Sequence, residues 1–351
     1  MLLALLLVAT AVIVQAQELV WDIDASAVVN NREGGDKAEA MDQTIPFTRL
    51  AAEVGISLDD STHTLMGGAA WFQPMIENLG GCKVVPTLYY RYSDGPWHLA
   101  LGWVPRTQLV EPLPTYLWND SLNYCTPNLR GGVAQVITQR AYAQIFLDWR
   151  QLPTQRRREA FNAVLSGYYR LLPHLSVGGY VQYNHLAKSK NDDIEEHVCD
   201  DLTLNPMLRY QTTWDNGAWL RIDGGAIIQL QRDRGDGNWL SPAAAVLSAQ
   251  GQWRWLEVRQ TFKAGGDIYP LRKRYGNLFN LGDNYYRDDF YSRTDVIGHL
   301  IQTSNVDVTL GMTLHVTDRK TGFWQQLAAR FYIDGSGWKG RKSSQKLRQL
   351  F

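Results

Sequence analysis

The sequence has few cysteines and no excess of charge of either sign. Its 351 residues include three cysteines, Cys82, Cys125 and Cys199. These are too few and too widely spaced for a disulfide framework or a zinc site of paired C-x-x-C type, and they allow at most one disulfide. The 35 Lys and Arg residues balance 35 Asp and Glu residues, with no basic stripe interleaved with aromatics. We therefore expect no cofactor, no bound metal and no nucleic-acid partner.

Long hydrophobic runs are also scarce. The run at the start, residues 1–17, is uncharged and ends in Val14-Gln15-Ala16, whose small and aliphatic residues suit cleavage by a signal peptidase. We predict that residues 1–16 are a signal peptide, and a buried first strand or helix is the alternative. No later stretch approaches the ~20 apolar residues of a spanning helix. A chain that spans a membrane would therefore have to cross it as strands.

What the sequence does contain is an apolar residue at every second position. From Val306 to Val316, apolar residues alternate with polar or small ones, and the same rhythm runs through residues 50–58, 202–210 and 220–230. These segments match the ~9 to 11 residues that a tilted strand needs to cross a bilayer. We predict about sixteen strands, at residues 18–30, 45–59, 63–73, 83–93, 97–105, 131–139, 141–150, 159–171, 174–187, 201–214, 218–232, 242–254, 256–263, 290–303, 305–317 and 322–333.

The connections between these segments alternate in length. Short ones, such as Asp94-Gly95-Pro96 and Asp215-Asn216-Gly217, carry hairpin turn residues, and long polar ones, such as 106–130 and 264–289, fall between them. Outer-membrane barrels have short periplasmic turns and longer external loops. The sequence therefore predicts an all-β fold, a closed antiparallel up-and-down transmembrane β-barrel over residues 17–334, in the bacterial outer membrane with both termini periplasmic. Residues 335–351 are predicted to form a basic periplasmic tail.

The polar face of the predicted strands carries charges of both signs. In hydrocarbon each would cost several kcal/mol, so we expect these residues to line the lumen: Arg49, Glu53, Arg91, Arg170, Arg209, Arg221, Asp223, Arg259, Arg293, Asp295, Asp307, His315 and Arg330. About sixteen strands enclose more space than wall side chains fill. The aromatic connection 264–289 is the candidate for an inward-folded constriction or an external glycan-stacking loop, through Tyr269, Tyr275, Phe279, Tyr285 and Tyr286.

Two segments carry a resemblance. Asp120-Ser121-Leu122-Asn123-Tyr124-Cys125-Thr126-Pro127-Asn128-Leu129-Arg130-Gly131, together with His63-Thr64-Leu65-Met66-Gly67-Gly68, resembles uncharacterised porin-like outer-membrane barrel proteins of Bacteroidota. The resemblance implies a barrel inserted in the lipid bilayer by the barrel-assembly machinery. It implies no catalytic residue. One departure is that the last predicted strand stops near Ile333, whereas such barrels commonly end on an aromatic residue that closes the last strand.

Candidate catalytic and metal-binding groups do not combine into a motif. The acidic loop 195–201 and the Gly-rich loop 233–238 contain metal-ligand types without a complete ligand set, and we interpret both as solvated loops. None of the seven histidines lies in a nucleophile motif. His98, His299 and His315 have the strand phase of lumen residues, where hydrogen bonding is the commoner role. We therefore predict a protein that is not an enzyme.

These patterns favour a porin-like channel for small hydrophilic solutes. The alternative is a barrel scaffold whose external loops, above all 106–130 and 264–289, bind glycan or a partner protein. A barrel-embedded hydrolase and a secreted soluble β-sandwich are less favoured, because a sandwich should not present apolar strips outward around every strand.

Overall fold

The computed structural model describes residues 18–34, 42–59, 61–76, 82–191, 193 and 195–335. The predicted signal peptide and residues 336–351 of the predicted tail lie outside the described residues. The strands are β1 (Glu18–Gly34), β2 (Gln43–Leu58), β3 (His63–Pro74), β4 (Lys83–Asp94), β5 (Trp97–Pro105), β6 (Asn128–Ile137), β7 (Ala141–Gln151), β8 (Ala160–Leu172), β9 (Leu175–Leu186), β10 (Cys199–Thr213), β11 (Trp219–Asp233), β12 (Trp239–Leu240), β13 (Ala243–Trp253), β14 (Leu256–Gly265), β15 (Phe290–Gln302), β16 (Val306–Thr317) and β17 (Thr321–Asp334). The helices are η2 (Arg106–Gln108), α2 (Asp120–Cys125), α3 (Arg272–Phe279) and η3 (Asn284–Arg287).

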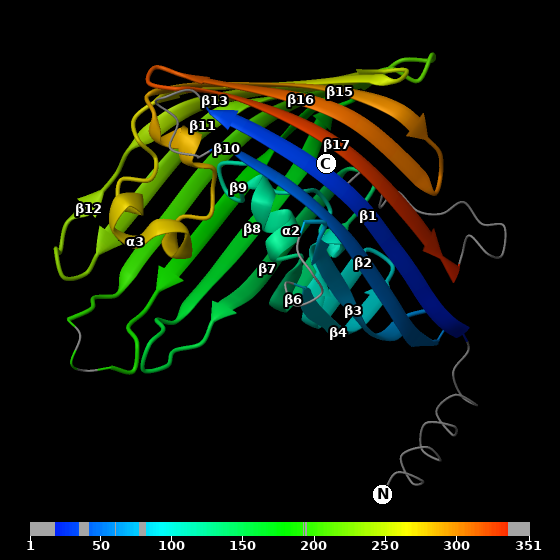
Figure 1. Ribbon diagram of the computed structural model, residues 1–351, viewed down its shortest axis with the longest axis horizontal. Coiled ribbons are helices and arrows are strands. Elements are labelled where there is room, and N and C mark those ends of the chain that lie inside the picture. The colour runs from blue at the N-terminus through cyan, green and yellow to red at the C-terminus, as the bar shows by residue number, and fades with distance from the viewer. Residues whose placement is uncertain are drawn as a thin grey trace, which may run out of the picture.

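The strands form one closed antiparallel barrel (Figure 1). Each long strand pairs with the next along the chain, and β1 closes the ring by pairing with β17 from Asp22↔Asp334 to Gly34↔Gly322. The two-residue β12 pairs only with the end of β11 and belongs to a connection. The predicted closed barrel of sixteen strands is thus confirmed, although β1, predicted to end at residue 30, continues to Gly34.

Alternating side chains on each strand point into the barrel or away from it. Leu208 on β10 is 56% exposed, whereas its neighbour Arg209 is 5% exposed. Val54 and Glu53 on β2 show the same contrast, at 55% and 8%. The apolar side chains therefore cover the outer wall and the charged ones face the lumen, as the alternation predicts.

The two ends of the barrel differ. Glu18 and Asp334 lie at the end that carries short turns, two of which use glycines at positive φ, Gly95 at +53° and Gly217 at +81°. The opposite end carries the long connections. The connection between β16 and β17, residues 318–320, departs from the alternation because it is short and lies at the long-loop end. Among the described residues, no helix is long and apolar enough to span a membrane.

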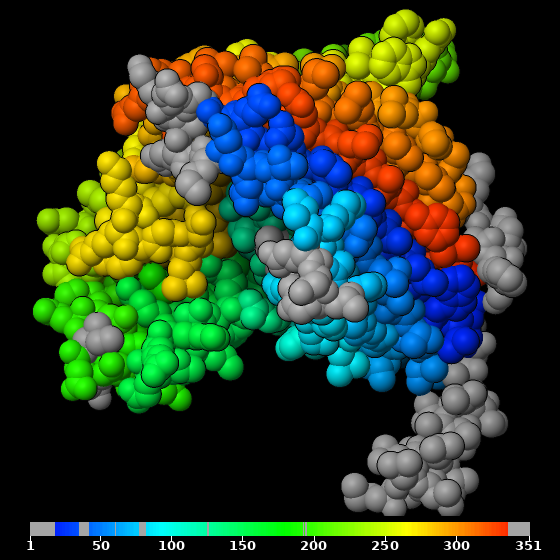
Figure 2. Space-filling view, viewed as in Figure 1, coloured from blue at the N-terminus to red at the C-terminus, as the bar shows by residue number. Residues whose placement is uncertain are grey.

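The wall is not equally tall all the way round. The neighbouring strands β5 and β6 have 9 and 10 residues, against 17 in β1. The ladder between β4 and β5 begins only at Leu88↔Trp103, so Lys83–Thr87 on the long-loop side are outside this ladder. The space-filling view shows a recess between the cyan and green parts of the wall, which contain β4 and β7 (Figure 2).

Candidate functional site

Two connections from the long-loop end fold into the lumen. Residues 106–127, which include η2 and α2, connect β5 to β6 and extend through the lumen to the wall at β9 and β10. There Tyr116 donates to Asn205 Oδ1 on β10 at 2.6 Å, and Gln182 on β9 donates to the Leu117 carbonyl at 3.3 Å. At its start, Arg106 pairs with Asp148 on β7 and lies 3.6 Å from the centre of the Trp118 ring. The segment is therefore fixed to the wall at β7, near its start, and at β9 and β10.

The second inserted connection, residues 266–289, is joined to the first. The Asn119 amide donates to the Leu281 carbonyl at 2.9 Å, and the Asp283 amide donates to the Thr115 carbonyl at 2.8 Å. The Tyr269 hydroxyl also donates to the Tyr116 carbonyl. We call this set of contacts the loop clasp. It makes a single lumen insert of two segments far apart in the chain.

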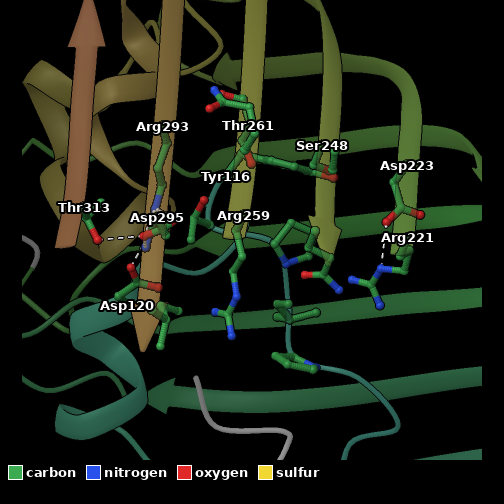
Figure 3. A pocket seen from close by; sticks show the side chains of 18 of the residues that line it. Tyr116, Asp120, Arg221, Asp223, Ser248, Arg259, Thr261, Arg293, Asp295 and Thr313 are labelled. Carbon is green, nitrogen blue, oxygen red and sulfur yellow. Dashed lines mark hydrogen bonds and ion pairs between the residues drawn. The ribbon is translucent and has the colours of Figure 1, made fainter. Parts of the chain in front are cut away.

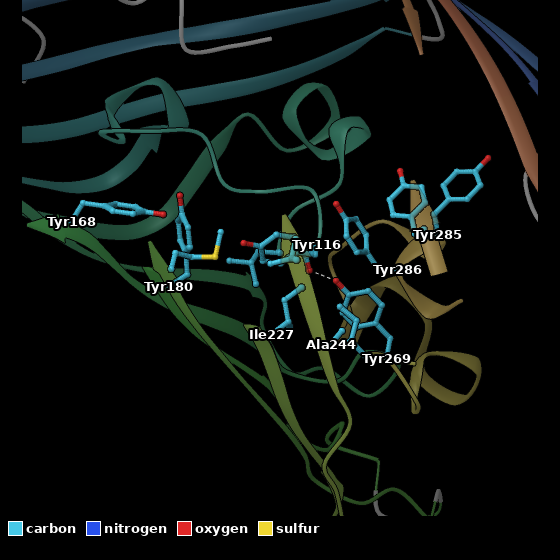
Figure 4. Packing of buried hydrophobic residues seen from close by; sticks show 13 residues of the cluster. Tyr116, Tyr168, Tyr180, Ile227, Ala244, Tyr269, Tyr285 and Tyr286 are labelled. Atoms are coloured by element: carbon cyan, nitrogen blue, oxygen red, sulfur yellow. Dashed lines mark hydrogen bonds between the residues drawn. The ribbon is translucent and has the colours of Figure 1, made fainter. Parts of the chain in front are cut away.

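An aromatic cluster packs the insert against the wall (Figure 4). From the loops come Tyr116, Leu117, Ile268, Tyr269, Tyr285 and Tyr286, and from the wall come Tyr168, Tyr180, Met207, Ile227, Ala244, Val246 and Tyr291. The lumen face of β8–β11, β13 and β15 therefore has an apolar patch that packs against the insert. Of the five aromatic residues proposed for a constriction, Tyr269, Tyr285 and Tyr286 lie in this cluster, and Phe279 is buried in a smaller one with Leu186 and Cys199. Tyr275 donates to Asp233 near the end of β11.

A cavity of about 260 Å³ lies between the insert and the wall. Its charged lining comes from α2 and from β10, β11, β14 and β15, and consists of Asp120, Arg209, Arg221, Asp223, Arg259, Arg293 and Asp295. Six of these seven residues were predicted lumen positions, and the fold brings them together. Figure 3 shows Arg221 and Arg259 extending into the open centre of this site.

Arg209 is the centre of the larger ionic group. Its guanidinium makes a bidentate pair with Glu111 of the insert, at 2.6 and 3.0 Å, and its Nε donates to Asp223 Oδ1 at 2.6 Å. It also lies 3.6 Å from the centre of the Tyr168 ring. Arg221 holds the second oxygen of Asp223 at 3.0 Å. Both carboxylates are thus paired with arginine through both of their oxygens.

A second ionic group lies across the cavity. Arg293 pairs with Asp295 at 2.9 Å and with Asp120 of α2 at 2.8 Å, and Thr313 donates to Asp295 at 2.7 Å. Arg259 contacts Glu257 through Nε at 2.7 Å. Its two terminal nitrogens have no hydrogen-bond partner among the described residues. These two nitrogens are therefore free hydrogen-bond donors that face the cavity.

Two acids of the insert have displaced pKa values. Burial would raise the pKa of Glu111, but the adjoining charges of Arg209 and Arg221 outweigh it and hold that pKa below its ordinary value. Burial raises the pKa of Asp283, against which the charge of Arg293 acts. The charged form of Glu111, in contrast to that of Asp283, is therefore stabilised by the fold.

The other predicted lumen residues lie outside this cavity. Arg49 and Arg330 both pair with Asp24 at 2.9 Å, and Glu53 accepts from the Tyr89 hydroxyl at 3.1 Å. Arg91 donates to Thr64 at 3.4 Å, and Asp307 lies 2.9 Å from His299. His315 lies 2.7 Å from the Tyr291 hydroxyl and stacks on Tyr285. Arg170 is exposed and donates to the Gln139 carbonyl in the β6–β7 turn at 2.6 Å.

A buried polar row crosses the inner face of β7–β11 near their long-loop ends. Asp148, Asn162, Asn184, Asp201 and Gln231 are successive cross-strand partners, and each is at most 1% exposed. The Asn280 amide of the insert donates to Asp201 at 3.2 Å. Within the described part of the chain, no group of three or more His, Cys, Asp or Glu residues is arranged to hold a metal ion.

Sequence reasoning missed the acidic residues of the insert. Glu111 and Asp120 lie in a connection without periodicity, which the alternation of short and long connections predicts to be an external loop. The signal that could have placed this connection inside is Tyr116-Leu117-Trp118, three large apolar residues in succession that are at most 4% exposed in the fold.

The fold and the lumen define the class of protein, a sixteen-stranded barrel of the type found in outer-membrane porins. Within that class, the chain belongs to the lipid A 3'-O-deacylase-type family, whose model matches residues 13–263. No curated protein matches the sequence.

Solved structures with a similar barrel come from Pseudomonas aeruginosa. OccK8 (OprE) aligns with a TM-score of 0.55 at 8% identity, covering 92% of this chain and 99% of that one. OccK1 (OpdK) aligns with a TM-score of 0.55 at 9% identity, covering 91% and 99%. OpdK has also been solved with vanillate, with the same TM-score, identity and coverage. At these identities the likeness concerns the fold.

Proposed function

We propose that the protein is an outer-membrane channel that admits small hydrophilic solutes through a lumen narrowed by the insert. The observation that carries this proposal is the cavity, which lies inside the barrel, is bordered by both inserted segments and is lined by charged residues. A lumen held only for stability would be expected to be filled by apolar packing, because buried charges are costly unless they are paired or hydrated.

The cavity favours solutes rich in hydrogen-bond acceptors. Its carboxylates are paired with arginines, whereas the terminal nitrogens of Arg259 are free and aimed inward. A carboxylate or the hydroxyl and ring oxygens of a saccharide would satisfy those donors. Vanillate, found with the similar barrel OpdK, is a small carboxylate of this kind.

Planar-bilayer recording tests the channel. The purified protein should give stepwise conductance, and Arg259→Gln should shift the reversal potential in a salt gradient toward cation preference. The matched control is Arg170→Gln, because Arg170 is exposed at a short turn away from the cavity; it should leave the potential unchanged. An ion-tight barrel, or equal shifts in both variants, would refute the proposal.

The orientation proposed is with the short turns and both termini in the periplasm. Cys82 is exposed at the long-loop end, whereas Cys199 is buried. A membrane-impermeant maleimide should therefore label the protein on intact cells, and Cys82→Ser should remove most of the label. Labelling that requires permeabilised cells would reverse the orientation.

The proposed channel has no deacylase activity, despite the name of its family. Two histidine pairs support this. Ser93 and His98 lie 2.6 Å apart, but on the lumen side beside a short turn, away from the proposed outer leaflet. His185 faces outward and lies 3.2 Å from Asp200, with no Ser, Thr or Cys among its described contacts. Incubation with lipid A should release no fatty acid. Release that is lost in His185→Ala would contradict the proposal.

A further inference from the structure

One continuous row of side chains crosses the outer face of the wall at the long-loop ends of β7–β12. Its members are Trp149, Phe161, His185, Asp200, Arg232 and Trp239, and each is the direct cross-strand partner of the next. We call it the rim row. It lies on the face opposite to the buried polar row, because its members alternate with those residues along the strands.

The contacts along the rim row are continuous. Trp149 lies 5.2 Å from Phe161, and Phe161 lies 4.9 Å from His185, measured between ring centroids. His185 lies 3.2 Å from Asp200, which accepts from Arg232 at 3.1 Å. The Arg232 guanidinium lies 4.5 Å from the centre of the Trp239 ring. The row is thus aromatic at both ends and ionic in the middle.

The ionic middle of the row is built around a buried carboxylate. Asp200 is 3% exposed and is covered by Arg232, by Arg234, which donates to it at 2.8 and 3.0 Å, and by Tyr183, which donates at 2.8 Å. The Arg234 side chain is 49% exposed. Two guanidinium groups against one carboxylate leave a net charge of +1 with His185 neutral, and the positive groups are the ones at the surface.

We propose that the rim row binds the phosphate-bearing headgroup of a lipid in the surrounding leaflet. The row faces away from the lumen at the rim of the wall, where the aromatic residues of outer-membrane barrels mark the membrane interface. The outer wall on the membrane side of the row is apolar, with Leu165 48%, Val177 41% and Ile228 37% exposed. Phosphate oxygens would meet the Arg232 and Arg234 donors while acyl chains lie along this wall, and the exposed Trp149 and Trp239 rings flank the headgroup at the interface. This inference goes beyond the channel and does not depend on an open lumen.

A pair of lipids that differ only in phosphate tests the proposal. Full-length protein in detergent is titrated with phosphatidic acid or with diacylglycerol of the same acyl chains, and retained lipid is counted by native mass spectrometry. The wild type should retain one phosphatidic acid at concentrations where diacylglycerol is lost. Arg232→Gln/Arg234→Gln should weaken that retention by about tenfold, the factor that one charge-assisted hydrogen bond of typical strength supplies.

The matched control is Arg254→Gln. Arg254 also lies over an indole, 4.9 Å from the Trp253 ring centre, but at the short-turn end of the barrel. It should retain phosphatidic acid as the wild type does. Arg234→Gln alone guards against misfolding, because this half-exposed side chain can be removed while the Arg232–Asp200 pair remains; it should give a smaller loss. Equal retention of the two lipids, or equal losses in the rim and control variants, would overturn the proposal.

The lipid-binding proposal and the channel proposal can be refuted independently of each other. Because the rim row points outward, the double variant should keep the wild-type conductance. Protein that conducts without retaining phosphatidic acid would remove the headgroup site and leave the channel. Protein that retains phosphatidic acid without conducting would do the reverse.

Discussion

Removal of the Arg209 charge should weaken the contact between the first inserted segment and the wall. Arg209 is nearly buried, with a side-chain exposure of 6%, and it holds Glu111 of the insert and Asp223 of β11 together. In Arg209→Met, both carboxylates lose their principal partner. Removing one partner of a buried ion pair costs about 3–5 kcal/mol, and we expect the free energy of unfolding to fall by that amount.

The coupling between Arg209 and Glu111 can be separated from the effect on Asp223. Glu111→Gln removes one charge but leaves Arg209 paired with Asp223 at 2.6 Å, so its cost should be smaller. For a bidentate, mostly buried pair we expect a coupling energy of about 1–3 kcal/mol in the double-mutant cycle. Equilibrium unfolding in urea, in detergent micelles, gives the free energy of unfolding of the wild type, the two single variants and the double variant. Additive effects of the two substitutions would refute the ionic tether.

Three further predictions concern the insert and the wall. Because the pKa of Glu111 is lowered in the fold, the contribution of its charge to stability should be complete above the ordinary pKa of 4.5. That contribution should be lost as the pH falls through the lower pKa of the folded protein. The urea midpoint of the wild type should therefore drop more below pH 4.5 than that of Glu111→Gln. Gly282→Ala would place a Cβ against the Tyr269 hydroxyl and the Tyr116 backbone, so it should open the loop clasp at a cost of about 1–3 kcal/mol and raise single-channel conductance; an unchanged conductance would show that the clasp does not limit the passage. Leu208→Arg places a charge on the outer wall and should cost about 2–4 kcal/mol if that wall meets hydrocarbon, against a smaller loss in Leu208→Ala; similar losses in both would count against a lipid-facing wall.

The strands could be predicted from the sequence because the barrel itself creates their pattern. One face of each strand meets an apolar medium and the other meets water or the insert. The polarity of each residue therefore indicates which face of the strand it lies on. That rule placed Arg209, Arg221, Arg259 and Arg293 on the same face, and the closed sheet then brought them to one cavity.

The insert could be predicted only in part. The connection 264–289 was a candidate for an inward-folded segment, and the structure places it in the lumen. The connection 106–130 is predicted to be external, yet residues 106–127 also lie inside the lumen. No periodic pattern distinguishes an inserted loop from an external one. The apolar run Tyr116-Leu117-Trp118 is the signal in this connection, because the loop clasp itself consists largely of backbone hydrogen bonds, such as those of Asn119 and Asp283.

The rim row also constrains how the barrel can assemble. In strands β7–β11 the buried polar row and the rim row lie one residue apart along each strand. The first faces the lumen and the second faces outward. A slip of one residue in any of these strands would turn Asp148 or Asp201 toward acyl chains and bring Trp149 or Phe161 into the lumen. In these five strands the correct register is thus selected by the surroundings of both faces of the wall at once.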